Sequence, residues 1–252
     1  MKYIKKLDER DLYGDGIGKV ELHDFSHAND NKKSRVEALA TVASICYGKP
    51  PKDAEKLVKR LQTESGGLPS SAFEFVRAWP IPTIGRSLRN DHSLEMTEPN
   101  GDNLDHAASV HGARIATFRI KVPIFIARQV MRHRQFSYQE LSRRYTDALR
   151  EWWVPKGESF MVRSAFRNQY VAYTNLLESG VPREQARSVL GTGLYTEFWM
   201  MGDTAAWANY FKLRLDLHTQ KEHRELAQAM ADLLEEHQLS LWKQVEPDKG
   251  AQ

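Results

Sequence analysis

The sequence of 252 residues predicts an α+β fold: a single domain with a sheet flanked by helices and a helix-rich second half. Three observations lead to this prediction. Residues 114–122 alternate apolar and polar side chains, which is typical of a half-buried strand. Other segments repeat apolar residues at the i, i+3, i+4 spacing of helices. No linker-like stretch divides residues 1–252 into two unlike halves, so we expect one domain.

Two helices are predicted before residue 64. The first covers residues 34–47, with apolar residues on one face and Gly48 just beyond its end. The second covers residues 53–63, where Ala54, Leu57 and Val58 follow the helical spacing. Residues 23–35 and 98–103 are rich in polar and turn-forming residues, so both predict loops.

The central strand leads directly into a helix. Within residues 114–122, Phe118 and Ile120 share one face, while Arg119 and Lys121 share the other. Pro123 suits the first position of a helix, because its fixed φ is helical and its missing N–H is not needed there. This helix is predicted to reach about residue 133.

Helices dominate the second half of the chain. Residues 164–179 predict a helix that Gly180 ends, and Pro182 opens a short helix that Gly191 closes. Residues 193–201 are rich in Tyr, Phe and Trp, which fits either a strand or a buried helix. Asp203 predicts an N-cap for one long helical region that reaches about residue 241.

Composition limits the classes of function. The 36 Lys and Arg against 33 Asp and Glu give a net charge of +3, which demands neither a nucleic-acid nor a membrane partner. No run of about 18 apolar residues predicts a membrane span, and the N-terminus lacks the apolar core of a secretory signal. Cys46 is the only cysteine, so a disulfide framework is excluded and a cytoplasmic location is expected.

Positive charge is concentrated in residues 128–150. Six arginines and two acids, Glu140 and Asp147, leave a local charge of +4. Guanidinium groups bind phosphate through paired hydrogen bonds, and the apolar run 124–127 predicts that Arg132 ends a buried helix. An anionic small molecule such as a nucleotide fits the segment better than duplex DNA, for which no motif is present. The arginines are Arg128, Arg132, Arg134, Arg143, Arg144 and Arg150.

This segment resembles the signature of the flavin-dependent thymidylate synthases. The signature is Arg-His-Arg, seven further residues and a serine, and here it runs from Arg132-His133-Arg134 to Ser142. Residues 118–129, 179–187 and 213–218 resemble further blocks of that family. The likeness covers residues 114–224 well and residues 20–75 loosely. It implies the flavin-dependent thymidylate synthase fold.

The resemblance also implies a reaction and its partners. The family methylates dUMP to dTMP, with methylenetetrahydrofolate as carbon donor, NADPH as reductant and a bound FAD as hydride carrier. It forms a homotetramer whose active sites are shared between subunits. The chain is therefore expected to be a methyltransferase that uses no cysteine nucleophile.

Residue roles follow from the positions that match the family. Arg214 matches the arginine thought to activate the uracil, and a guanidinium beside the ring would stabilise a developing anion. The FAD-side positions are Ser71, Arg132, His133, Arg134, Glu140, Asn209 and His218. The dUMP-side positions are Gln129, Arg132, Glu140, Leu141, Ser142, Arg143, Arg144, Arg187 and Arg214.

Spacing and residue type add four expectations. On a regular helix Arg214 and His218 lie about 40° apart and share a face. Asn209 lies about 140° from Arg214, so it is expected to serve a different face, in the pocket of a neighbouring subunit. Cys46 is expected to be buried and inert within the first helix. Ser142 has no Asp-His relay spacing, so it is expected to bind nucleotide rather than act as a nucleophile.

The chain departs from the family between residues 66 and 111. The family carries two histidines shortly before its central strand, and this chain lacks both, near Ser71 and Phe75. Residues 76–111 are expected to be an insertion that forms a surface excursion, and one of its histidines could replace a missing one. The candidates are His92, His106 and His111.

No metal site is predicted. Neither His218 with His223 nor His106 with His111 has the His-Glu-x-x-His spacing of a zinc helix. Two alternatives to an active enzyme stay open. One is a family relative that binds nucleotide or flavin without activity. The other is a nucleic-acid-binding protein that uses the arginine cluster, which would show a steep salt dependence.

Overall fold

The computed structural model describes residues 4–24, 32–45, 48, 52–64, 115–157 and 159–237. Their fold is α+β, around a five-stranded antiparallel sheet of order β1-β2-β3-β5-β4. Ser71, Cys46 and the predicted insertion and loop at 76–111 lie outside the described residues. The strands are β1 (Lys5–Asp11), β2 (Lys19–Asp24), β3 (Ile115–Pro123), β4 (Ser137–Glu140) and β5 (Tyr195–Asp203). The helices are α1 (Lys32–Ser44), α2 (Ala54–Glu64), α5 (Ile124–Val130), α6 (Ser159–Glu178), α7 (Arg183–Ala186), η4 (Arg187–Val189), α8 (Thr204–Arg214) and α9 (Lys221–Glu236).

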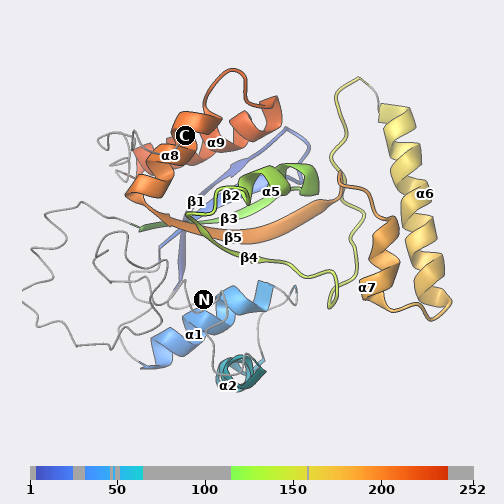
Figure 1. Cartoon of the computed structure of the whole chain (residues 1–252), viewed down its shortest axis with the longest axis horizontal. Helices are drawn as coiled ribbons and strands as arrows, with labels where there is room; N and C mark the ends of the chain where they lie inside the picture. The colour runs from blue at the N-terminus through green and yellow to red at the C-terminus, as the bar shows by residue number, and fades with distance from the viewer. Residues whose placement is uncertain are drawn as a thin grey trace, which may run out of the picture.

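One face of the sheet is covered by α5, α8 and α9 (Figure 1). The alternation predicted for the central strand is confirmed, because Phe118, Ile120 and Val122 are fully buried on this face. They pack with the aromatic residues of α8, among them Trp207 and Tyr210. Burial of this apolar surface is the main source of stability for the fold.

The opposite face carries α1 and α2, while α6 and α7 lie beyond the end of the sheet (Figure 1). Leu39 and Val42 of α1 pack on Trp199 and Met201 of β5, so the apolar face predicted for this helix is confirmed. The second helix begins as expected, since Asp53 accepts a hydrogen bond from Lys56 N at 2.9 Å.

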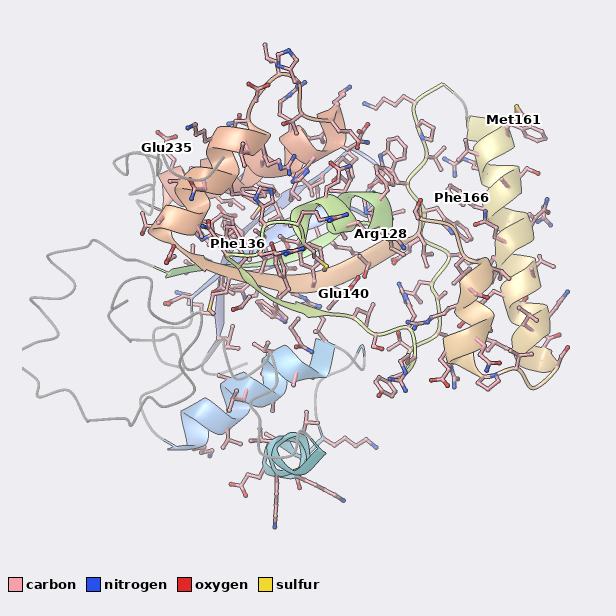
Figure 2. The ribbon with its side chains drawn as sticks, in the orientation of Figure 1. Arg128, Phe136, Glu140, Met161, Phe166 and Glu235 are labelled. Carbon is pink, nitrogen blue, oxygen red and sulfur yellow. The ribbon has the colours of Figure 1, made fainter. Side chains whose placement is uncertain are left out.

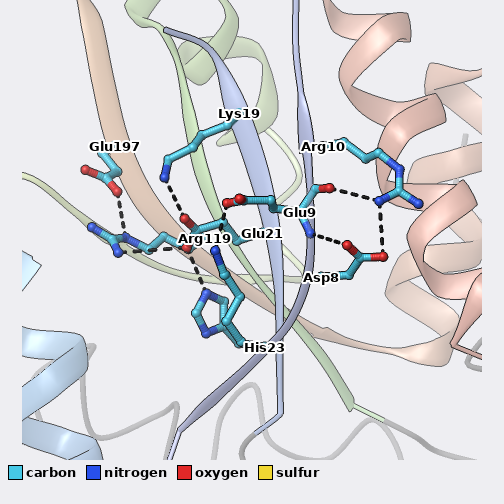
Figure 3. A network of polar contacts seen from close by, with 9 residues as sticks. Asp8, Glu9, Arg10, Lys19, Glu21, His23, Arg119 and Glu197 are labelled. Carbon is cyan, nitrogen blue, oxygen red and sulfur yellow. Dashed lines mark hydrogen bonds and ion pairs between the residues drawn. The ribbon is translucent and has the colours of Figure 1, made fainter. Parts of the chain in front are cut away.

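Charged side chains occupy the remainder of the α1 face (Figure 3). The buried Glu21 carboxylate accepts hydrogen bonds from His23 Nε2 at 3.0 Å and Lys19 Nζ at 2.7 Å, and Arg119 pairs with Glu197 at 2.6 Å. Burial alone would raise the pKa of Glu21, but the hydrogen bonds from His23 and Lys19 outweigh it and lower the pKa to about 2. These pairs explain how charged side chains can be buried on the face of the sheet opposite its apolar face.

Several predicted ends are confirmed. Gly180 follows α6 at φ 84°, and Val181 N donates back to Leu176 O at 2.9 Å, as in a glycine-terminated helix. Asp203 caps α8, since its Oδ1 accepts from Ala206 N at 2.8 Å. Residues 195–203 form a strand, which resolves the alternatives left open for this aromatic segment. Helix α6 begins five residues earlier than predicted.

Two predicted helices are too long. The region after Asp203 is not one helix, because α8 ends at Arg214 and α9 starts only at Lys221. In the turn between them, the Asp216 carboxylate accepts from the backbone N–H and Nδ1 of His218, both at 2.8 Å, which favours the turn over a further helical bond. The helix after Pro123 likewise ends at Val130, with Pro123 as its N-cap.

Three strands were not predicted. Strand β2 extends to Asp24 and therefore replaces the start of the loop expected at residues 23–35. Strands β1 and β4 show little apolar alternation. They form because their backbones pair with those of β2 and β5. None of the helices in the described ranges is long and apolar enough to cross a membrane.

Candidate active site

The Arg-His-Arg turn is anchored to the core at both ends. It follows α5, which buries Ile126, Ala127 and Val130, and it is closed by the buried Phe136. The Phe136 ring packs edge-on against Trp207 of α8, with centroids 4.5 Å apart. The Tyr138 hydroxyl lies 2.9 Å from Val130 O and 3.0 Å from His133 O, so β4 is tied back to the same turn. Figure 2 shows Phe136 at the start of β4 and Glu140 at its end.

Within this turn the three side chains point in different directions. Arg132 and Arg134 are exposed, and among the described residues their guanidinium groups make no hydrogen bond or ion pair. His133 is half-buried and faces the aromatic cluster, with its ring 4.8 Å from that of Tyr210. The three side chains therefore do not share one solvated face.

His133 receives a hydrogen bond from Arg214, the residue matched to the activating arginine. Arg214 Nε donates to His133 Nε2 at 2.8 Å, so this imidazole nitrogen carries no proton and the ring is neutral. Burial and the adjacent Arg214 charge lower the pKa of His133 to about 4. The bond uses one donor of Arg214 and fixes the plane of its guanidinium. No described residue accepts from its four other N–H groups, which can therefore bind a ligand.

A second neutral imidazole lies behind the first. His223 of α9 is fully buried, and its Nε2 lies 3.1 Å from the Tyr210 hydroxyl. Its Nδ1 lies 3.3 Å from Oε1 of Gln129 on α5. Burial, followed by the charges of Arg214 and His133, lowers the pKa of His223 to about 3. The packing of α5, α8 and α9 thus brings Gln129, His133 and Arg214 together. We call these three residues the α8 group.

The neutral imidazoles predict a dependence of stability on pH. In the unfolded chain a histidine takes up a proton below its ordinary pKa of 6.5, whereas His223 stays neutral in the fold until about pH 3. The free energy of unfolding therefore decreases progressively as the pH falls from about 6.5 toward 4. The free energy of unfolding can be measured with urea at several pH values in this range. His223→Gln is expected to reduce its dependence on pH by up to about 1.4 kcal/mol per pH unit.

The matched control for this measurement is His218→Gln. The His218 side chain is 98% exposed and lies in the turn after α8, so this variant shows the effect of removing a histidine that the fold does not bury. Equal slopes for His223→Gln and the unmutated protein would show that His223 is not held neutral by the fold.

A second set of predicted residues lies after β4. Glu140 Oε1 accepts from Thr196 Oγ1 at 2.7 Å, which fixes this carboxylate against β5. The Arg143 guanidinium donates to Asp147 O and Tyr195 O, both at 2.9 Å. Burial lowers the pKa of Arg143, yet the group remains a cation at neutral pH. Arg143 therefore ties residues 143–147 to the sheet and shapes the loop that carries its neighbours.

Two exposed arginines of this set converge on α7. Arg144 Nε pairs with the Glu184 carboxylate at 3.1 Å, and Arg187 Nε donates to Glu184 O at 3.2 Å. The Arg144 guanidinium also lies 5.5 Å from the Tyr145 ring centroid. We call Ser142, Arg144 and Arg187 the α7 group. Because exposed ion pairs are weak, a phosphate could displace Glu184 from Arg144 at little cost.

The structure separates the predicted dUMP-side residues into two groups. In Figure 1, α8 lies over one face of the sheet and α7 lies beyond the end of the sheet, with strand β5 between them in the chain, so the α8 group and the α7 group lie apart within one chain. Asn209 contacts the residue just after the Arg-His-Arg turn, since its Nδ2 donates to Gln135 Oε1 at 3.3 Å.

Two other predicted site residues, Leu141 and His218, lie outside both groups. Leu141 packs half-buried against the α1 cluster. His218 does not share a helix face with Arg214, because the helix has ended before it.

Sequence reasoning missed Tyr210, Gln220 and His223 as parts of the site. Tyr210 lies one helical turn before Arg214, so helical spacing could have paired them. Nothing in the sequence places α9 against α5, and the contacts of His223 and Gln220 with Gln129 depend on that packing. Among the described residues, no three His, Cys, Asp or Glu side chains are grouped so that they could hold a metal ion.

The chain belongs to the Thy1 family, described as thymidylate synthase complementing protein, whose model matches residues 29–238. This membership confirms the resemblance carried by the arginine-rich signature.

Several relatives are named flavin-dependent thymidylate synthase. The one from Thermotoga neapolitana is 38% identical over 134 residues, which cover 48% of this chain and 62% of that one. The one from Pseudothermotoga lettingae is 37% identical over 134 residues, 47% and 61% of the two chains. The one from Thermus thermophilus is 36% identical over 147 residues, 50% and 54% of the two. The match thus spans less than two thirds of the length of these relatives.

A solved structure of a UMP/dUMP methylase, PolB from Streptomyces cacaoi bound with 5-Br UMP, is 25% identical. It covers 48% of this chain and 68% of its own, with a TM-score of 0.47.

Proposed function

We propose that the protein is a flavin-dependent thymidylate synthase, a methyltransferase that converts dUMP to dTMP. Methylenetetrahydrofolate is the carbon donor and NADPH the reductant, and no cysteine acts as nucleophile. The observation that carries the proposal is Arg214, a cation oriented by the neutral His133 with most of its donors left for a ligand. The family membership and the relatives' names support it.

The described residues suit FAD. Arg132 and Arg134 present two guanidinium groups that no described carboxylate neutralises, and such groups bind a pyrophosphate well. These two arginines, with His133 and Asn209 beside them, would hold the cofactor. When bound, FAD supplies the hydride-transfer chemistry, while the protein supplies orientation and charge. Glu140, His218 and Ser71 remain proposed flavin-side positions.

The chain's own residues would act on the nucleotide by charge and position. Arg144 and Arg187 of the α7 group would bind the phosphate, and the Ser142 hydroxyl and Leu141 with Arg143 would shape that subsite. Arg214 would lie beside the uracil and stabilise the anion that develops as C5 becomes electron-rich. The neutral state of His133 matters here, because a protonated ring could not accept the Arg214 N–H bond that orients the guanidinium.

We further propose a homotetramer with shared active sites. Within one chain the α7 and α8 groups lie apart, because α8 covers a face of the sheet and α7 lies beyond the end of the sheet (Figure 1). A second copy could supply the missing group. Exposed apolar side chains offer surface for such contacts, including Phe160 at 83% and Met161 at 73% on the first turn of α6 (Figure 2) and Leu217 at 83% after α8.

The remaining parts of the proposal concern organisation. Residues 1–252 would form one domain, with residues 76–111 as an insertion, and a cytoplasmic location fits a nucleotide-synthesis enzyme. Binding of nucleic acid by the arginine cluster is the competing function. It would appear as oligonucleotide binding with a steep salt dependence in a protein that carries no flavin.

Flavin binding gives the first test of the proposal. The purified protein is expected to be yellow, with absorbance near about 450 nm. The double variant Arg132→Ala with Arg134→Ala should weaken flavin binding by about tenfold or more, because two charge-assisted contacts to phosphate are lost. The measurement is titration of the flavin-free protein with FAD.

The matched control is Arg150→Ala. Arg150 belongs to the same arginine-rich segment, but its guanidinium lies over the Tyr170 ring at 4.6 Å, away from the turn. It should bind FAD like the unmutated protein. A double variant with unchanged flavin affinity would remove Arg132 and Arg134 from the cofactor site.

A further inference from the structure

A continuous line of hydrogen bonds crosses from the core to the surface beside Arg214. Tyr210 bonds to His223 at 3.1 Å, and His223 bonds to Gln129 at 3.3 Å. Gln129 Nε2 donates to Gln220 Oε1 at 2.6 Å, and Gln220 Nε2 donates to the Glu222 carboxylate at 3.0 Å. The line therefore links α8, α9 and α5 through five side chains.

The direction of every bond in this line is set from its outer end. A carboxylate only accepts, so Gln220 must turn its NH₂ group toward Glu222 and its oxygen toward Gln129. Gln129 must then donate to that oxygen with its NH₂ group, and its own Oε1 faces His223. An amide oxygen only accepts, so the proton of His223 must sit on Nδ1.

The inner end agrees with this direction. With its proton on Nδ1, His223 presents a bare Nε2 that accepts from the Tyr210 hydroxyl. Burial raises the pKa of Tyr210, so this hydroxyl keeps its proton. His223 is fully buried, and the described groups around it are Gln129, Tyr210, the His133 ring and the Arg214 cation, with no carboxylate among them.

We propose that His223 is a positioning residue, which as its Nδ1–H tautomer holds the inner end of the Gln129 carboxamide and, together with Gln220 at the outer end, locks it in one orientation. The lock leaves one N–H of Gln129 free to donate to an oxygen of the bound nucleotide. Without this lock, a half-exposed glutamine would adopt both orientations of its amide. Only one of them directs an N–H toward the nucleotide oxygen. This inference rests on the proposed function, because it takes dUMP as the ligand of Gln129.

Two replacements of His223 separate its two nitrogens. Asparagine places an amide near the position of Nδ1, so His223→Asn keeps a donor for Gln129 and loses the partner of Tyr210. Glutamine places its amide near the position of Nε2, so His223→Gln keeps the contact with Tyr210 and loses the lock. His237→Gln is the matched control, since His237 lies just after the same helix, beside Asp8 at 3.5 Å.

The experiment measures KM for dUMP and kcat in the full-length, flavin-loaded protein. We expect His223→Gln to raise KM by about tenfold with a smaller change in kcat, as for a lost hydrogen bond at a buried partner. His223→Asn should stay within about twofold of the unmutated protein. Equal impairment of the two variants would overturn the proposal, since a packing role does not distinguish the nitrogens.

Nitrogen-15 NMR of the unmutated chain supplies a readout that needs no turnover. The expected result at neutral pH is a neutral His223 with protonated Nδ1 and bare Nε2. A proton on Nε2, or on both nitrogens, would contradict the lock directly. If the unmutated protein neither binds nor methylates dUMP, the proposed function fails, and the NMR result still decides whether His223 orients Gln129.

Discussion

Arg214→Ala is expected to lower the rate of dTMP formation by about 10²- to 10³-fold, because it removes the cation placed to stabilise the uracil anion. Flavin binding should survive, since Arg132 and Arg134 provide the proposed contacts to the cofactor. The measurement is single-turnover dTMP formation in protein whose flavin content is matched to that of the unmutated enzyme. Loss of kcat and of kcat/KM by the same factor would indicate that the interaction is made in the transition state.

Two further variants define what Arg214 contributes. Lys212→Ala removes an exposed cation from the same helix and should leave turnover unchanged. Arg214→Lys keeps the charge but loses the planar donor that bonds to His133, so it should recover only part of the rate. Near-normal turnover in Arg214→Ala would remove the activating role assigned to this residue.

Mixing two inactive variants is expected to restore activity if active sites are shared between chains. Arg214→Ala damages the α8 group and leaves the α7 group intact, while Arg187→Ala does the reverse. Random assembly of the two chains at equal amounts leaves about one quarter of the sites with both intact groups, as follows from independent choice of each contributing subunit. Turnover of the co-expressed mixture should therefore reach about one quarter of the unmutated level.

The controls for mixing come from the same helices. Each variant alone should remain inactive at every concentration. Arg183→Ala breaks the exposed pair with Asp147 and should keep activity by itself, because Arg183 is outside the proposed dUMP site. A mixture that stays inactive, although both chains assemble together, would place the complete site within one chain and contradict the shared arrangement.

The local features of the fold could be predicted from the sequence. The alternation through Phe118 and Ile120 identifies β3, and Asp203 and Gly180 mark helix ends through hydrogen bonds that depend on neighbouring residues only. The break after Arg214 was missed, because a helical pattern resumes at Lys221 and the turn depends on one carboxylate, Asp216.

The composition of the site could be predicted better than its arrangement. The arginine-rich signature identified the residues, but their separation into the α7 and α8 groups depends on strand β5, which α7 precedes and α8 follows. The neutral state of His133 depends on burial by α8, and the role of His223 depends on the packing of α9 against α5. Such contacts join residues more than eighty positions apart, which local patterns do not encode.

The central claim is that this chain makes dTMP from dUMP by a flavin-dependent route. It is tested most directly by incubating the flavin-loaded protein with dUMP, methylenetetrahydrofolate and NADPH, and measuring dTMP. We expect dTMP formation that requires all three compounds and persists in Cys46→Ala. Absence of dTMP with fully flavin-loaded protein would contradict it and leave a nucleotide- or flavin-binding relative without activity.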